Sequence, residues 1–229
     1  MTAPRRALIV IDAQRVYFDG LLPIQHPARD ASLARTGAAM DAAERAGIPA
    51  VVVQHEAPAG FPVFAPESPS FELHPEIAQR ADAAAHRIRK SYSSVFAGTG
   101  LEEWLREREI DTITLVGYMT NNCVIASAAA AEPLGLTVEV LSDATGAIDI
   151  VNAAGAAPAQ QVHETTMALL HSNWAAVATT DEWTAAVQAE HALAADNLIE
   201  SAARGRDGAT GPWRGHSMPA QGAQSAQIQ

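Results

Sequence analysis

The sequence predicts an α/β fold: a doubly wound, mainly parallel six-stranded sheet with helices on both faces, in a Rossmann-type three-layer arrangement. Short runs of strand length alternate along the chain with longer segments of helical pattern. Most of the short runs are almost continuously apolar, as strands of a parallel sheet are when both of their faces are buried. The length of 229 residues fits a single domain of this class.

The elements follow one another in a regular order. We expect strands at residues 7–11, 50–54, 86–90, 112–116, 137–141 and 175–178. We expect helices at about residues 30–46, 75–84, 101–109, 122–132, 158–171 and 181–193. Right-handed crossovers would place these helices on both faces of the sheet, and functional residues would gather beyond the carboxyl ends of the strands.

Two segments fall outside this alternation. Residues 204–229 are rich in Gly, Ser, Gln and Pro, so we expect a domain at residues 1–203 followed by a C-terminal tail outside the core. Residues 54–73 hold four prolines and three phenylalanines without clear periodicity. That composition indicates a long structured loop that covers a site, although a plain surface connection is the alternative.

Composition excludes several classes of function. The net charge of −11 and the absence of any Lys/Arg-rich run argue against nucleic acid and an anionic membrane surface as partners. The apolar run before Asp12 has five residues, too short for a signal-peptide core or a membrane span, which favours a cytoplasmic protein. The single cysteine excludes an internal disulfide and a thiolate-rich metal site.

Three reactive side chains come at or after the ends of different predicted strands. Asp12 directly follows the first strand, Lys90 ends the third, and Cys123 follows the fourth after a short turn. A lone charged residue at a strand end commonly marks only where solvent begins, and a lone cysteine is commonly a small buried hydrophobic residue. Because the fold brings all three to one edge of the sheet, we interpret them as a catalytic set.

The chemistry of each side chain suggests its role. Cys123 would lie on the first turn of a helix, capped by a residue of 120–122, where the helix dipole and free N–H groups lower its pKa below about 8.5. Those N–H groups could also hold an oxyanion. Asp12 would carry the proton, while Lys90 would stabilise the thiolate and the carboxylate.

Four blocks resemble the isochorismatase-like cysteine hydrolases in order and approximate spacing, over about residues 5–180; they are residues 9–14, 90–101, 116–124 and 142–144. The resemblance implies that Asp12, Lys90 and Cys123 form a catalytic triad. It also implies a non-proline cis peptide bond at Tyr118–Met119. The backbone N–H groups of Met119 and Cys123 would then form the oxyanion hole.

The expected ligands are less well defined than the triad. Six residues are candidates for substrate binding: Gln14, Tyr17, His55, Phe61, Phe64 and Tyr118. The alternatives are that these side chains pack in the core or satisfy a strand end. Nicotinamidases of the family carry an Asp-x-His metal signature after the second strand, whereas this chain has Gln-His-Glu at residues 54–56. The remaining His74 cannot hold a divalent metal alone, so we expect no metal and no cofactor.

The resulting hypothesis is hydrolysis of an amide, ureido or carbamoyl bond in a small molecule, through a thioester. An esterase or lactam hydrolase with the same triad is the nearest alternative. A catalytically idle homologue that acts as a binding protein, or a redox sensor, is an alternative of a different class. A sensor usually has an exposed thiol and a resolving cysteine, and this sequence has no second cysteine.

The alanine-rich segments at residues 122–132 and 158–171 predict flat helix faces. The resemblance to the isochorismatase-like hydrolases also implies a dimer or tetramer. We therefore expect a homodimer or homotetramer at micromolar concentration. Multi-angle light scattering measures the mass directly. A single species of 24.1 kDa would contradict the expectation.

Overall fold

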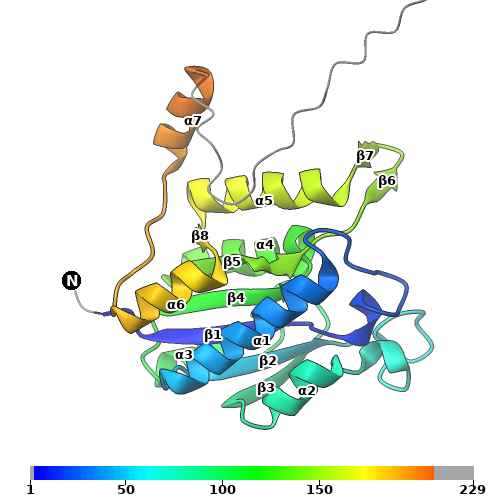
Figure 1. Cartoon of the computed structure of the whole chain (residues 1–229). Coiled ribbons are helices and arrows are strands. Elements are labelled where there is room, and N and C mark those ends of the chain that lie inside the picture. The colour runs from blue at the N-terminus through cyan, green and yellow to red at the C-terminus, as the bar shows by residue number, and fades with distance from the viewer. Residues whose placement is uncertain (1–2, 209–229) are drawn as a thin grey trace, which may run out of the picture.

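The computed structural model describes residues 3–208 of the chain. Its centre is a six-stranded, fully parallel sheet in the order β3-β2-β1-β4-β5-β8 (Figure 1). The strands are β1 Arg6–Ile11, β2 Ala50–His55, β3 His86–Lys90, β4 Thr112–Tyr118, β5 Thr137–Gly146 and β8 Ala176–Ala178. The predicted fold class is confirmed, and all six predicted strands are present.

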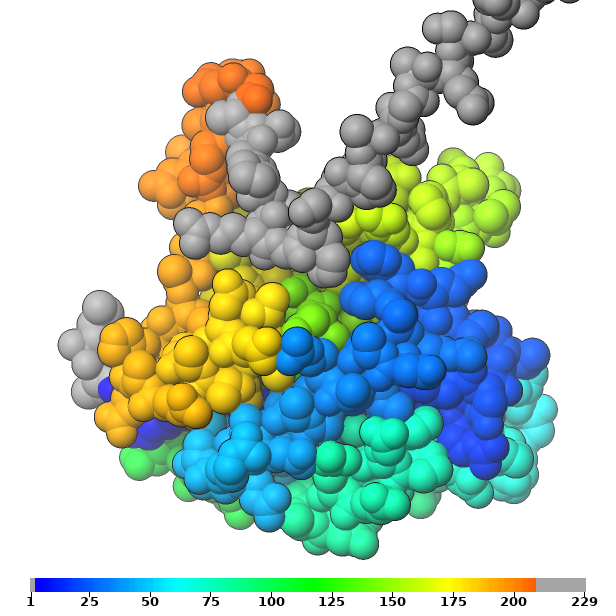
Figure 2. Space-filling view, in the orientation of Figure 1, coloured from blue at the N-terminus to red at the C-terminus, as the bar shows by residue number. Residues whose placement is uncertain are grey.

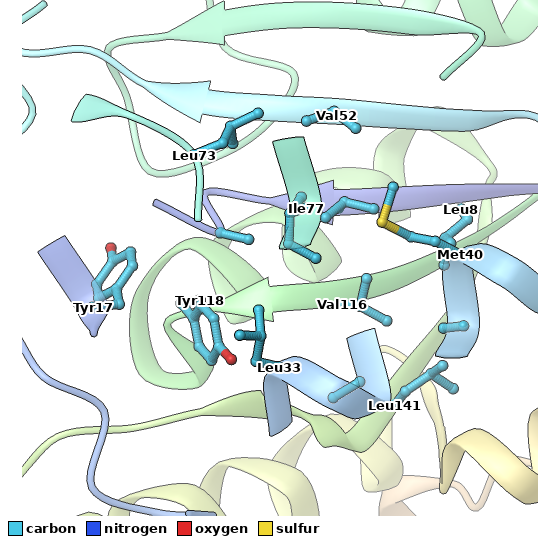
Figure 3. Close-up of a cluster of buried hydrophobic side chains, with 14 of the residues drawn as sticks. Leu8, Tyr17, Leu33, Met40, Val52, Leu73, Ile77, Val116, Tyr118 and Leu141 are labelled. Carbon is cyan, nitrogen blue, oxygen red and sulfur yellow. The ribbon is translucent and has the colours of Figure 1, made fainter. Parts of the chain in front are cut away.

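Helices cover both faces of this sheet. One face carries α1 Arg29–Arg45, α2 Pro75–Ala81 and α6 Thr180–Gln188, which lie side by side in Figure 2. The other face carries α3 Leu101–Glu107, α4 Ile125–Ala131 and α5 Ala159–Asn173. Each layer encloses its own cluster of buried apolar side chains, and Figure 3 shows the cluster beneath α1 and α2.

Short elements complete the structure. Three 3₁₀ turns occur at Arg15–Tyr17, Pro69–Phe71 and Glu132–Leu134, and a small hairpin pairs β6 Ile150–Asn152 with β7 Gly155–Ala157. The helix α7, Leu198–Arg206, has no buried residue and projects from the body (Figure 1). The expected boundary at residue 204 therefore falls inside a helix. Residues 209–229 of the expected tail lie outside the described residues.

The helix expected at residues 122–132 begins later than the sequence suggested. A π-helical turn, Thr120–Val124, comes first, and α4 starts at Ile125. The carbonyl oxygen of Met119 accepts N–H groups from both Asn122 and Val124, which widens the turn. The expected side-chain cap is absent, because the Thr120 hydroxyl instead contacts His163 Nδ1 at 2.9 Å.

The helix expected at residues 181–193 ends at residue 188 in the structure.

Within residues 3–208, none of the helices combines the length and apolar character required to cross a membrane.

Strand register brings the carboxyl ends of four strands together. Ile11 pairs with Val53 on one side and with Gly117 on the other. Gly117 has φ +99°, and a Cβ placed there would lie 2.0 Å from the Ile11 carbonyl oxygen. Only glycine lets β4 approach β1 this closely, at the point where Asp12 leaves the sheet.

We therefore expect Gly117→Ala to lower the free energy of unfolding by about 3 kcal/mol or more, through combined overlap and backbone strain. Gly135→Ala is the matched control, since Gly135 also has a positive φ (+69°) but open space around it. The control should cost only about 1–2 kcal/mol. Urea unfolding measures the free energy of unfolding of both variants. Equal losses would contradict the importance of the close approach between β4 and β1.

A candidate active site at the carboxyl edge of the sheet

A buried ion pair lies at the end of β1. Lys90 Nζ is 2.7 Å from Asp12 Oδ2, and both side chains are fully enclosed. Asp12 adopts the left-handed region with φ +48°, a conformation that costs a non-glycine residue about 1–2 kcal/mol. Its Oδ1 accepts no hydrogen bond within residues 3–208. The carboxylate thus has one oxygen on the ammonium and one oxygen available.

The Lys90 ammonium is the centre of this cluster. Besides Asp12, it contacts His55 Nδ1 at 3.1 Å, the Tyr92 carbonyl oxygen at 3.2 Å and Cys123 Sγ at 3.2 Å. An ammonium carries three hydrogens, so these four neighbours must share them. The structure therefore unites the three residues that the sequence singled out, and adds a histidine and a backbone carbonyl.

Cys123 lies in the π turn, 2% exposed. Its carbonyl oxygen accepts a 2.6 Å hydrogen bond from Ser127, and the Ser127 hydroxyl in turn accepts the Val95 N–H at 3.1 Å. The peptide bond Tyr118–Met119 is cis, at the position that the family resemblance implied. The Met119 N–H has no acceptor in the described part of the chain, as an oxyanion donor requires.

The protonation state of the cysteine differs from the expectation. Burial and the Asp12 carboxylate together raise the pKa of Cys123 to about 12, although the Lys90 ammonium opposes both. The expected thiolate with a pKa below about 8.5 is therefore wrong. Desolvation of the enclosed thiol outweighs the favourable charge of Lys90. At neutral pH Cys123 is a thiol.

The neighbouring groups show the same effect of burial. Burial raises the pKa of Asp12 above its ordinary value, although the Lys90 ammonium counteracts part of that change. Burial, with a contribution from Lys90, lowers the pKa of His55 to about 4. His55 is therefore neutral at physiological pH.

Three of the candidate substrate-binding residues lie together beside the triad. The Phe64 ring contacts His55, with ring centroids 4.8 Å apart, and Tyr17, with centroids 5.8 Å apart. Phe64 has φ +61°, an uncommon conformation for an aromatic residue. Burial raises the pKa of Tyr17 well above its ordinary value, and the charges of Asp12 and Cys123 add to this increase. These three residues form an aromatic wall.

The other three candidates have different surroundings. Phe61 is 55% exposed on the loop surface. Tyr118 is a core residue whose hydroxyl bonds to Ser32 at 2.8 Å, and Figure 3 shows its ring among the buried side chains. The Gln14 amide is occupied by backbone: Oε1 accepts from the His55 N–H, and Nε2 donates to the carbonyl oxygens of His55 and Phe71. Gln14 holds the end of β2 and the following loop in place.

Three contacts of the site were not predicted from the sequence. The Tyr92 carbonyl is a backbone group, so its role depends only on the path of the loop after β3. Ser127 follows the nucleophile by four residues, one helical turn, and this spacing alone could have indicated its bond to the Cys123 carbonyl. His163, which contacts Thr120 in the nucleophile turn, comes from a distant helix.

The site does not fit a divalent metal ion. Donor atoms of Asp12, His55 and Cys123 lie within 4.8 Å of one another, as metal ligands would. The Lys90 ammonium, however, is within 3.2 Å of all three, so a cation already occupies the space between them. Gln54, in place of a carboxylate, donates its amide to the Phe71 carbonyl oxygen.

The charges around Cys123 predict opposite effects on its alkylation. At pH 9, below the pKa of about 12, the rate with iodoacetamide is proportional to the thiolate fraction. Asp12→Asn removes a charge that raises this pKa, so alkylation should become up to about tenfold faster for each pKa unit lost. Lys90→Ala should make it slower. Asp41→Asn, which breaks a distant pair with Arg80, is the control and should alkylate like wild type. Identical rates in all four proteins would show that the three residues are not electrostatically coupled.

Treatment with EDTA should leave the melting temperature and any hydrolytic activity unchanged, because Lys90 takes the place of a metal. Differential scanning fluorimetry and activity before and after dialysis provide the measurement. Loss of stability or activity that Zn²⁺ or Fe²⁺ restores would contradict this expectation.

Comparisons with known proteins agree with the geometry. Residues 6–182 match the model of the isochorismatase domain. A crystal structure from Burkholderia xenovorans LB400, provisionally named an isochorismatase, is 48% identical with a TM-score of 0.88, covering 92% of this chain and 100% of that one. A secreted isochorismatase effector of Verticillium dahliae is 34% identical over 143 residues, 62% of this chain and 73% of the effector. The structure of a nicotinamidase from Bacillus subtilis is 25% identical with a TM-score of 0.60, covering 76% of this chain and 99% of that one. The chain belongs to the isochorismatase family.

Proposed function

We propose that this protein is a cysteine hydrolase that cleaves a non-peptide C–N bond of a small molecule through a thioester acyl-enzyme. The observation that carries the proposal is the contact of one buried ammonium with both a carboxylate and a thiol. Lys90 Nζ lies 2.7 Å from Asp12 and 3.2 Å from Cys123. A nucleophile beside a base that a third group orients is the arrangement of covalent catalysis.

Acylation begins from the neutral thiol. Cys123 transfers its proton to the Asp12 carboxylate as sulfur attacks the carbonyl carbon. Burial raises the pKa of Asp12, which makes this carboxylate a stronger base than an exposed one. The electrons of the carbonyl double bond move to its oxygen, and the N–H groups of Met119 and Cys123 would hold the resulting oxyanion. Lys90 stabilises the negative charge wherever it resides during the transfer.

Collapse of the tetrahedral intermediate breaks the C–N bond. The leaving nitrogen takes the proton from Asp12 and departs as an amine or ammonia. Water then attacks the thioester and gives a proton to Asp12. Collapse of the second intermediate breaks the C–S bond, the acid leaves, and the proton returns to sulfur. Each half of the reaction uses the same base, so no cofactor is required.

The proton path and the names of related proteins both favour a C–N bond as the bond that is cleaved. A carboxyl that has just accepted the thiol proton can protonate a leaving nitrogen, which an amide needs more than an ester does. One related structure is named a nicotinamidase, which denotes an amide substrate. A redox role is less compatible, because Cys123 is 2% exposed and the sequence offers no resolving cysteine.

We extend the proposal to location and assembly. A cytoplasmic location agrees with the single free cysteine, and a homo-oligomer agrees with the alanine-rich segments at residues 122–132 and 158–171. One relative is secreted, so cell fractionation with an antibody against the chain is the direct test of location.

Cys123→Ala and Cys123→Ser should both lose essentially all turnover while retaining the wild-type fold, since the residues around the thiol tolerate a small side chain. Ammonia release from a panel of primary amides, ureas and N-carbamoyl compounds provides the assay, and circular dichroism reports the fold. Turnover by Cys123→Ala near the wild-type rate would eliminate the covalent mechanism.

A further inference from the structure

His55 is the most exposed of the four side chains in the cluster. It ends β2 in register with Lys90, the last residue of β3. Asp12, Lys90 and Cys123 are at most 2% exposed, whereas the His55 side chain is only partly buried. A substrate that approaches the thiol therefore meets the imidazole before it reaches the triad.

The Lys90 contact fixes which nitrogen of His55 carries the proton. Lysine ammonium is a donor only, so at 3.1 Å it must donate to Nδ1. Because the pKa of His55 is lowered to about 4, the ring is neutral and its single hydrogen is on Nε2. That N–H has no acceptor among residues 3–208. The ring therefore offers one hydrogen-bond donor with no partner.

The donor is also held in position. Gln14 binds both the N–H and the carbonyl oxygen of the His55 backbone, at 2.8 Å and 3.0 Å. The Phe64 ring contacts the imidazole, with centroids 4.8 Å apart. Backbone, ring and Nδ1 are each restrained, so little further ordering is needed when Nε2 binds a ligand.

We propose that His55 is a specificity-determining residue whose Nε2–H binds a second carbonyl oxygen on the substrate, close to the scissile carbonyl. The inference rests on the proposed function and narrows it to uncharged amides with such a second acceptor. A carboxylate is disfavoured, because the ion pair of Lys90 with Asp12 is already neutral and the neighbouring Arg89 pairs with Glu56 at 3.0 Å.

Two compounds of equal size distinguish a hydrogen bond to His55 from steric fit alone. Acetoacetamide and 3-methylbutanamide share one skeleton, and a carbonyl oxygen in the first replaces a methyl group in the second. Protection of Cys123 from iodoacetamide at pH 9 measures binding of each without requiring turnover. In wild type, acetoacetamide should protect at about tenfold lower concentration, the value of one hydrogen bond in a preformed site.

Two variants then separate the two ring nitrogens. His55→Gln presents an amide N–H near the Nε2 position, whereas His55→Asn presents an acceptor near Nδ1 and no donor that reaches as far. The preference for acetoacetamide should persist in His55→Gln and disappear in His55→Asn. His86→Gln is the matched control, since His86 stacks on Trp104 at the other end of β3, and it should behave like wild type.

The outcomes separate this inference from the proposed function. Equal protection by the two compounds in wild type, or no protection by either, overturns the role of His55. A preference that survives in His55→Asn as fully as in His55→Gln overturns it as well. Selective binding of acetoacetamide without release of ammonia from any amide would instead overturn the proposed function and leave the recognition role in place.

Discussion

The buried Lys90 ammonium is the constraint on which the site depends. A charge in a water-free interior is costly unless it is paired and fully hydrogen-bonded, and Lys90 meets this requirement through partners from four segments. They are Asp12 after β1, His55 at the end of β2, Tyr92 after β3 and Cys123 after β4. The register of the parallel strands brings these ends together, and the close approach at Gly117 lets β4 lie against β1. One cation thus sets the positions of the Asp12 carboxylate, the Cys123 thiol and the His55 imidazole at once.

The same burial decides how the nucleophile is activated. A permanently charged thiolate would need Lys90 to outweigh both desolvation and the Asp12 carboxylate, whereas the pKa of Cys123 is raised to about 12. In the mechanism that we propose, activation occurs during attack, when the proton moves to Asp12 and the negative charge shifts from carboxylate to sulfur within reach of the same ammonium. The total charge of the cluster does not change in this step, so the interior never has to hold an additional unpaired charge.

The sequence was sufficient to predict the sheet and to group Asp12, Lys90 and Cys123, but not to predict the roles of the side chains around them. Apolar runs identify buried parallel strands such as β1 and β4, and the more polar β3 also has the bounds that were expected. Residues at strand ends meet at one edge by topology alone, which is why Asp12, Lys90 and Cys123 could be grouped. The roles of Gln14 and Phe61 depend on the path of residues 54–73, which no periodicity records. The pKa of the thiol depends on burial by distant segments, and this was invisible in the local motif.

The central claim is that the proton resides on Cys123, and not on Asp12, before substrate binds, and infrared spectroscopy tests it most directly. Because Cys123 is the only cysteine, its S–H stretching band in the infrared spectrum has a single source, and Asp12→Asn identifies any carboxylic-acid band from Asp12. The account predicts an S–H band at neutral pH, absent in Cys123→Ala and lost only in strong alkali, with no carboxylic-acid band from Asp12. A spectrum at neutral pH without the S–H band and with a protonated Asp12 would contradict it, because the proton would then have left sulfur before any substrate arrived.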